Sequence, residues 1–247
     1  MGSSAGQRAG QRAALAALGA ASIVCLLAPA AQAQAGNAAL ANPAVNVAPT
    51  KAMQLACDRG TDQQCQAAVV QVIDQARHAQ GVVPLVLPPY YDSATVVQQL
   101  LVLTNLERVN RGLPGFTGLS SHLDLLAQTG ASTNGDPTGP AGTSWGSNWA
   151  GGESSAILAD FDWMYDDGYG SPNVDCTRAL AAGCWDHRAN VLANYGPHPA
   201  MGSGATKVNG VTSMTELFSS GGPGHLDYRV PTTLAELRPT RNGRSSK

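Results

Sequence analysis

Residues 151–190 contain side chains that suit acid–base chemistry: Glu153, Asp166 with its neighbour Asp167, and His187. Glu153 follows two glycines, so other backbone segments can approach it closely. A carboxylate beside an imidazole favours the charged histidine or holds one tautomer, which is what proton transfer requires. The same pair also serves as a hydrogen-bonded brace or as part of a metal site, with His187 as the ligand. The residues alone therefore leave bracing, ligand binding, catalysis and metal binding open.

A helix, a loop and a second helix must bring these groups together. Helical spacing of apolar residues predicts a helix that begins at Glu153 or Ser154 and ends at residues 166–168. Residues 169–183 are rich in glycine and polar residues and predict a long loop, which a Cys176–Cys184 disulfide would order. A short helix over 184–194 then carries His187 in its first turn. The carboxylates and the imidazole can meet only if this loop folds back.

The remaining pattern predicts an α+β fold. Helices are expected from Thr61 to Gly81, from Asp92 or Ser93 to about residue 110, and from residues 119–121 to about Ala131. A short strand is predicted over 145–150. Two β runs, 200–208 and 211–218, flank Asn209-Gly210, a strong hairpin signal. Helices that precede a hairpin indicate an α+β class with a C-terminal antiparallel hairpin.

The N-terminus has the features of a signal peptide over residues 1–33. Arg8 and Arg12 precede a small apolar stretch, and Ala31-Gln32-Ala33 fits the signal-peptidase rule. An uncleaved anchor is the alternative, although the stretch is too short and alanine-rich for a permanent membrane span. The expected protein is therefore secreted and extracellular. Its expected parts are a flexible linker over 34–55, a helical extension over 56–92, a main domain over 93–220 and a disordered tail over 221–247.

Charge and cysteine content narrow the class of protein. With 15 basic and 17 acidic residues the net charge is −2, and loss of Arg8 and Arg12 gives 13 − 17 = −4. A mildly acidic surface argues against a nucleic-acid partner. The mature chain would keep Cys57, Cys65, Cys176 and Cys184, which in an exported protein indicate two disulfides. Cys57–Cys65 with Cys176–Cys184 is the simplest of three connectivities, and the spacing disfavours a four-cysteine zinc site.

An ordered series of segments resembles the CAP superfamily, in its bacterial SCP-like extracellular branch. The matching segments are Thr104–Leu113, Gly152-Glu153, Trp163–Asp166, Asp186–Leu192, and Gly202–Gly204 with Thr215–Phe218. They are similar to the family's Asn-x-x-Arg-x-x-x-Gly-Leu, Gly-Glu-Asn, Trp-Met, Gly-His-Arg-x-Asn-Ile-Leu and the glycine and phenylalanine motifs of its last strands. The resemblance covers about residues 95–220.

The resemblance implies an α–β–α sandwich with a cleft that holds a His-Glu-Glu-His tetrad. Glu153 matches the first acid, His187 matches the second histidine, and Asp166 occupies the place of the second acid. The first histidine has no counterpart, and Ser154 replaces the usual asparagine. No cofactor is therefore expected, and a divalent metal is doubtful. Aromatic residues near these motifs are expected to line the cleft: Trp149, Trp163, Tyr165 and Trp185.

Three functions compete on this basis. The resemblance favours a non-catalytic binding module for a small apolar or cell-envelope ligand. The second is an extracellular hydrolase that uses His187 with Glu153 or Asp166 on peptide or cell-wall substrates. Ser144, in a GxSxG match, is a weak nucleophile candidate because turn formers rather than a strand precede it. The third is an envelope interaction protein whose disulfide loop contacts a partner. The sequence does not determine the oligomeric state.

Overall fold

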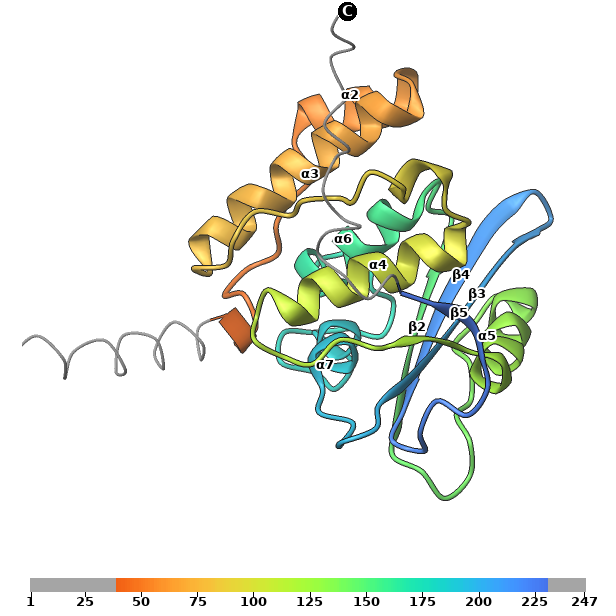
Figure 1. The fold of residues 1–247 in the computed structure, drawn as a ribbon. Helices are drawn as coiled ribbons and strands as arrows, with labels where there is room; N and C mark the ends of the chain where they lie inside the picture. The colour runs from red at the N-terminus through yellow and green to blue at the C-terminus, as the bar shows by residue number, and fades with distance from the viewer. Residues whose placement is uncertain (1–38, 231–247) are drawn as a thin grey trace, which may run out of the picture.

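The computed structural model describes residues 39–230 and has a mixed α+β fold (Figure 1). Along the chain the elements are α2 (Lys51–Arg59), α3 (Asp62–Ala79), a 3-10 turn η1 (Tyr91–Ser93), α4 (Val96–Val109), β1 (Gly118–Ser120), α5 (Ser121–Thr133), β2 (Trp145–Gly151), α6 (Ala156–Tyr165), α7 (Asp186–Leu192), β3 (Ala200–Val208), β4 (Val211–Ser219) and β5 (Leu226–Arg229). The predicted signal peptide, residues 1–33, lies outside the described residues. In the part that is described, no helix is long and apolar enough to cross a membrane.

The five strands form one sheet in the order β2-β4-β3-β1-β5, with helices on both faces. Helix α5 covers one face, while α4, α6 and α7 lie on the other (Figure 1). Only the β1–β3 pair is parallel. The predicted hairpin is confirmed: β3 and β4 pair antiparallel from Ala200–Ser219 to Val208–Val211, and Asn209 and Gly210 both have positive φ. Those dihedrals are what a two-residue hairpin turn requires.

The helix starts differ by a few residues from the sequence prediction. Helix α4 begins after Thr95, whose side chain forms a capping box with Gln98, rather than after Asp92 or Ser93. The latter pair belongs to η1. Helix α6 begins at Ala156 instead of Glu153 or Ser154. For α4 the capping box with Gln98 selects Thr95 among several polar residues near the start, whereas Ser155, which precedes α6, forms no side-chain cap.

Part of the predicted flexible linker is ordered structure. Lys51–Arg59 form helix α2, which the Thr50 side chain caps. Upstream, Val47 donates its N–H to the Tyr165 carbonyl at 2.8 Å, and the Asn46 side chain bonds to the backbone of Gly168. Residues 51–55 are therefore helical, and Asn46 and Val47 are hydrogen-bonded to the domain, where a flexible linker was predicted. Alanine, asparagine and proline content indicated an irregular chain, but tertiary hydrogen bonds fix that chain against the domain.

The predicted disordered tail also contains a strand. β5 pairs antiparallel with β1, with Leu119 opposite Tyr228, and forms the edge of the sheet. The boundary at residue 221 is therefore wrong for residues 226–229, and residues 231–247 lie outside the described part. His225, just before β5, contacts Ser121 Oγ at 2.7 Å. A four-residue strand carries too little periodicity to be identified from sequence.

Candidate acidic cleft

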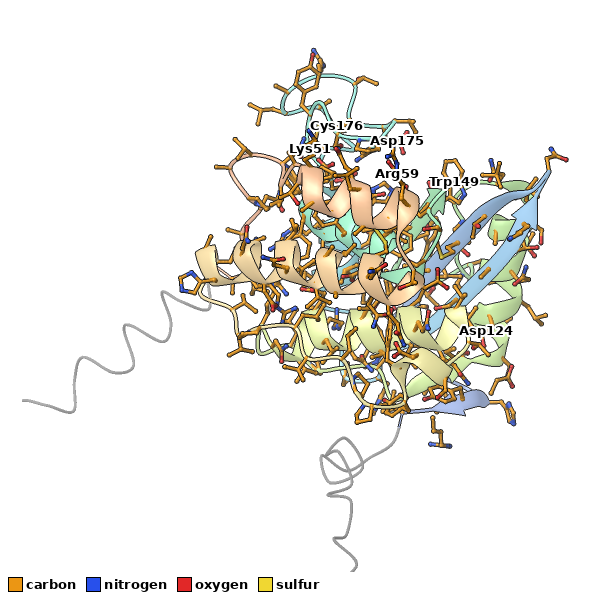
Figure 2. All side chains as sticks on the ribbon, turned by 90° about the horizontal axis from the view of Figure 1, so that it is seen from above. Lys51, Arg59, Asp124, Trp149, Asp175 and Cys176 are labelled. Atoms are coloured by element: carbon orange, nitrogen blue, oxygen red, sulfur yellow. A yellow bond between two sulfur atoms is a disulfide. The ribbon has the colours of Figure 1, made fainter. Side chains whose placement is uncertain are left out.

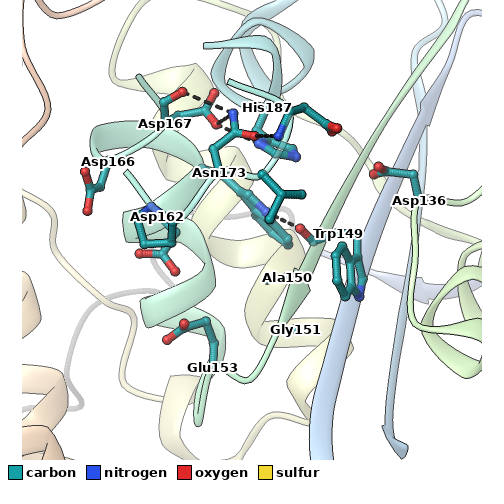
Figure 3. Close-up of a pocket in the computed structure, with 14 residues that line it drawn as sticks. Asp136, Trp149, Ala150, Gly151, Glu153, Asp162, Asp166, Asp167, Asn173 and His187 are labelled. Atoms are coloured by element: carbon teal, nitrogen blue, oxygen red, sulfur yellow. Dashed lines mark hydrogen bonds and ion pairs between the residues drawn. The ribbon is translucent and has the colours of Figure 1, made fainter. Parts of the chain in front are cut away.

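A cavity of about 130 Å³ opens between β2, helix α6 and the loop that the Cys176–Cys184 disulfide closes (Figure 3). Its lining comes from segments far apart in the chain: Asp136, Trp149, Ala150, Gly151, Glu153, Asp162, Trp163, Asp166, Asp167, Pro172, Asn173, Val174, Asp175 and His187. Six of these residues are carboxylic acids, one is a histidine and none is lysine or arginine. In Figure 2 the loop that carries Asp175 and Cys176 extends beyond the body of the molecule.

His187 pairs with Asp167 at one end of the cleft. Its Nδ1 lies 2.6 Å from Asp167 Oδ1, and the Asp167 side chain is almost fully buried. The backbone N–H of Arg188 donates to Asp167 Oδ2 at 3.3 Å. Among the described residues, His187 Nε2 has no hydrogen-bond partner. The imidazole therefore uses one nitrogen for the pair and leaves the other for a ligand or a proton.

The surroundings of His187 favour its charged form. Burial lowers the pKa of His187, but the hydrogen bond and charge of Asp167, together with Asp136 and Asp175, outweigh burial and raise it above 6.5. Behind the cleft, Asn148 Nδ2 bonds to the His187 carbonyl at 3.3 Å and to Glu216 at 3.4 Å. Burial raises the pKa of Glu216 to about 8, against hydrogen bonds from Thr104 and Asn148.

At the other end of the cleft, Glu153 and Asp162 form a carboxyl pair. Burial raises the pKa of Asp162 to about 9, and the charge and side-chain hydrogen bond of Glu153 add to the rise. Two carboxyl groups that share a hydrogen bond cannot both ionise without a cost in free energy, so the pair retains one proton at neutral pH. Between the two ends, burial and then the charge of Asp167 raise the pKa of Asp166 to about 6. The cleft thus holds both ionised and protonated acids at neutral pH.

Two of the four predicted aromatic residues line the cleft. Trp149 and Trp163 do so, and the Trp163 indole N–H donates to the Trp149 carbonyl at 3.2 Å, on the open edge of β2. The prediction for Tyr165 is wrong, because its hydroxyl is buried against Glu107 at 2.9 Å on the far side of α6. Trp185 is not among the lining residues either, and its ring packs near Gly168. The helix geometry explains the position of Tyr165. It is two residues beyond Trp163, so its side chain points about 200° away around the helix axis.

The three predicted acid–base residues all line the cleft, but their partners differ from those expected. His187 pairs with Asp167 instead of Asp166, and Glu153 pairs with Asp162 instead of the histidine. Sequence reasoning missed Asp162 as a site residue, although it precedes Asp166 by one helical turn, a spacing that places both on one face. Asp136 and Asp175 lie in loops, and no local pattern marked them.

The predicted disulfides Cys57–Cys65 and Cys176–Cys184 are both present. No group of three or more His, Cys, Asp or Glu side chains within residues 39–230 has a geometry that would hold a metal ion. The carboxylates of the cleft are spread around its wall instead of converging on one point (Figure 3). His187 as a metal ligand thus has no support from this arrangement.

Comparisons of the chain with protein-family models, with curated proteins and with solved structures gave no match.

Proposed function

We propose that the chain is a secreted, CAP-like binding module whose acidic cleft takes a small ligand with a positively charged group, without covalent turnover. The observation that carries this proposal is the lining: six carboxylic acids, one histidine and no lysine or arginine. Such a concave, like-signed wall concentrates cations, because the low-dielectric protein around it focuses the field. A purely apolar ligand would leave these carboxylates desolvated and unpaired, which costs free energy.

The size of the cleft and its aromatic wall narrow the ligand further. About 130 Å³ is well below the roughly 300–1,000 Å³ of pockets for drug-sized ligands, so an amine with a few carbons fits better than a large molecule. Trp149 and Trp163 supply apolar surface, and an indole face also attracts cations. An amine displayed on a cell-envelope polymer or on a lysine side chain has this chemistry.

The CAP-like and extracellular parts of the proposal have separate support. The chain resembles that superfamily over five ordered segments, and it has a sheet between two helical layers, as the resemblance implies. Two disulfides and the signal-like N-terminus suit an oxidising compartment. These features favour secretion.

The test uses a matched pair of probes of equal length, n-butylammonium and butyrate, titrated into the purified chain at pH 7.5 and low salt. We expect saturable NMR shifts of the Trp149 indole N–H and the His187 ring with the cation, and none with the anion. Asp166→Asn removes one charge from the wall and should weaken cation binding several-fold. Asp58→Asn, on exposed α2, should not. Equal responses to the two probes would contradict the proposal.

A hydrolase is the second candidate, and the Asp167–His187 pair is the observation that favours it. With Nδ1 held by the carboxylate, Nε2 of the neutral ring can take a proton from water, as a general base does, and the raised pKa of His187 shifts this neutral state to higher pH. No serine, threonine or cysteine lines the cavity, so the nucleophile that His187 would activate in this candidate is a water molecule. Ser144 precedes β2 and starts no helix, unlike a nucleophile elbow. Release of peptides from casein or fragments from peptidoglycan that disappears in His187→Ala supports this candidate, and equal rates exclude it.

A further inference from the structure

We propose that Asn173 is a positioning residue: its side-chain amide fixes the Asp167 carboxylate, which in turn holds His187 with Nε2 toward the cleft. Asn173 itself lies in the wall of the cavity, on the segment that leads into the disulfide loop. The inference concerns the geometry of the site proposed above and does not depend on which ligand the site binds.

The contacts of Asn173 connect the two halves of the site. Its Nδ2 donates to Asp167 Oδ1 at 2.6 Å, and also lies 3.1 Å from the Asp167 carbonyl and 2.8 Å from the Gly183 carbonyl. Its Oδ1 accepts the N–H of Asp175 at 2.9 Å. One side chain thus ties the exit of α6 to the disulfide loop (Figure 3).

The contact with Oδ1 is the important one, because His187 uses the same oxygen. Oδ1 receives two short hydrogen bonds, from Asn173 and from His187, both at 2.6 Å. The other oxygen receives one longer bond from the backbone of Arg188. Without Asn173, the His187 ring and the weaker backbone donor of Arg188 would have to hold the Asp167 carboxylate against rotation. A rotated carboxylate would no longer accept from Nδ1, and the ring would lose its orientation.

The disulfide acts on His187 through the same residue. Cys176–Cys184 closes an eight-residue separation, and the carbonyl of Gly183, next to Cys184, accepts from the Asn173 amide. Trp185 also donates its backbone N–H to the Asp167 carbonyl at 2.9 Å. The loop is therefore attached to the segment that carries Asp167 at Gly183, through Asn173, and at Trp185, with one attachment on each side of Cys184.

Asn46 provides a matched control, because it ties the neighbouring residues without touching a carboxylate. Its Oδ1 accepts from Gly168 N at 2.7 Å, and its Nδ2 lies 3.3 Å and 3.1 Å from the carbonyls of Gly168 and Tyr169. Both asparagines therefore stabilise the same stretch of chain, but only Asn173 reaches the side chain that His187 contacts.

The experiment measures the pKa and the tautomer of His187 by ¹⁵N NMR, with no ligand present, in wild type, Asn173→Ala and Asn46→Ala. Both variants should lower the melting temperature. Only Asn173→Ala should lower the His187 pKa, by on the order of half a unit, and reduce the Nδ1–H share of the neutral ring, because the pairing with Asp167 is what raises that pKa. Of the other charges near the ring, Asp136 and Glu216 have no hydrogen bond to either asparagine. Asp175 donates its N–H to Asn173, so its own effect on the His187 pKa is measured in Asp175→Asn.

An unchanged or raised His187 pKa in folded Asn173→Ala would overturn the proposal and leave Asn173 as a loop brace only. If that variant does not fold, Asn173→Ser replaces it: a hydroxyl has one hydrogen and cannot serve both Asp167 and Gly183, so the pKa should again fall. Butylammonium binding is measured separately. An unchanged His187 pKa in Asn173→Ala, with butylammonium binding to the wild type observed, contradicts only the positioning role. A lowered His187 pKa in that variant, with no butylammonium binding to the wild type, contradicts only the proposed ligand.

Discussion

Acids of similar intrinsic strength behave differently within one cleft because their neighbours differ. Burial raises the pKa of Asp167, and the hydrogen bonds from His187, Asn173 and the Arg188 backbone lessen that rise without reversing it. Asp162 instead faces Glu153, and its pKa rises to about 9. Burial, and then the charge of Asp167, raise the pKa of Asp166 to about 6. At the scale of single residues, therefore, burial raises the pKa of each of these acids, and the neighbouring charges and donors add to the rise or lessen it.

Asp162→Asn should stabilise the protein at pH 8 more than at pH 4. The folded-state pKa of about 9 exceeds the ordinary 3.8, so Asp162 favours folding below pH 3.8 and loses that contribution as the pH rises toward 9. Asparagine resembles the protonated acid and does not titrate. Melting temperatures of both proteins at the two pH values test this, and an equal difference at pH 4 and pH 8 contradicts it.

At the scale of elements, close contact between helix α5 and strand β3 depends on glycine. A Cβ added at Gly204 would lie 2.5 Å from the carbonyl carbon of Ala127 and from the backbone N of Gln128. Thr215, on β4, also donates its hydroxyl to the Ala127 carbonyl at 2.7 Å. The helix backbone therefore rests directly on the sheet, and this fixes one outer layer of the sandwich.

Gly204→Ala should destabilise the protein by about 1–3 kcal/mol, since the contacted atoms belong to the backbone and cannot rotate away. Gly135 serves as the control, because nothing lies within 4 Å of a Cβ added there and its φ is not positive. Gly135→Ala should change the unfolding free energy by no more than about 0.5 kcal/mol. Urea denaturation measures both, and equal effects would show that the contact at Gly204 relaxes freely.

At the scale of the whole molecule, a buried ion cluster joins the N-terminal helices to the domain. Glu107, on α4, pairs with Arg77 from α3 at 2.7 Å and with Arg111, and the three side chains are fully buried. The Tyr165 hydroxyl donates to the same carboxylate. Arg111 further donates to the Ala39 carbonyl at 2.9 Å. The segment before α2, helices α3 and α4, and helix α6 thus share one polar centre beneath the cleft.

Glu107→Gln should cost about 3–5 kcal/mol of unfolding free energy, because two buried guanidinium groups lose their counter-charge. Asp58→Asn, on the exposed side of α2, should stay within about 0.5 kcal/mol. Burial raises the pKa of Glu107, but Arg111, Arg77 and the Tyr165 hydrogen bond outweigh it and hold that pKa below 4.5. Its contribution is therefore present above pH 4.5 and is lost as the pH falls through the folded-state value. Urea denaturation at pH 7 checks the size, and similar losses in both variants contradict it.

Local sequence determined those features that depend on near neighbours in the chain. The Asn209-Gly210 turn and the capping box of α3 at Thr61 follow from residues a few positions apart. The two disulfides have the simplest of the three pairings that the sequence allowed. The sequence also predicted that Glu153, Asp166 and His187 share one cleft, on the condition that the loop before His187 folds back. The α+β class follows from the same local patterns.

Only the tertiary structure decided which acid meets the imidazole, and it placed Asp136 and Asn173 beside that pair. Asp166 and Asp167 are adjacent, and helix α6 ends at Tyr165, so the direction in which each side chain points depends on how the chain leaves the helix. Val47, far upstream in the chain, donates its N–H to the Tyr165 carbonyl at that exit. Hydrogen bonds between such distant segments have no periodicity along the chain. For this physical reason the sequence predicted the cleft but not the pairing within it.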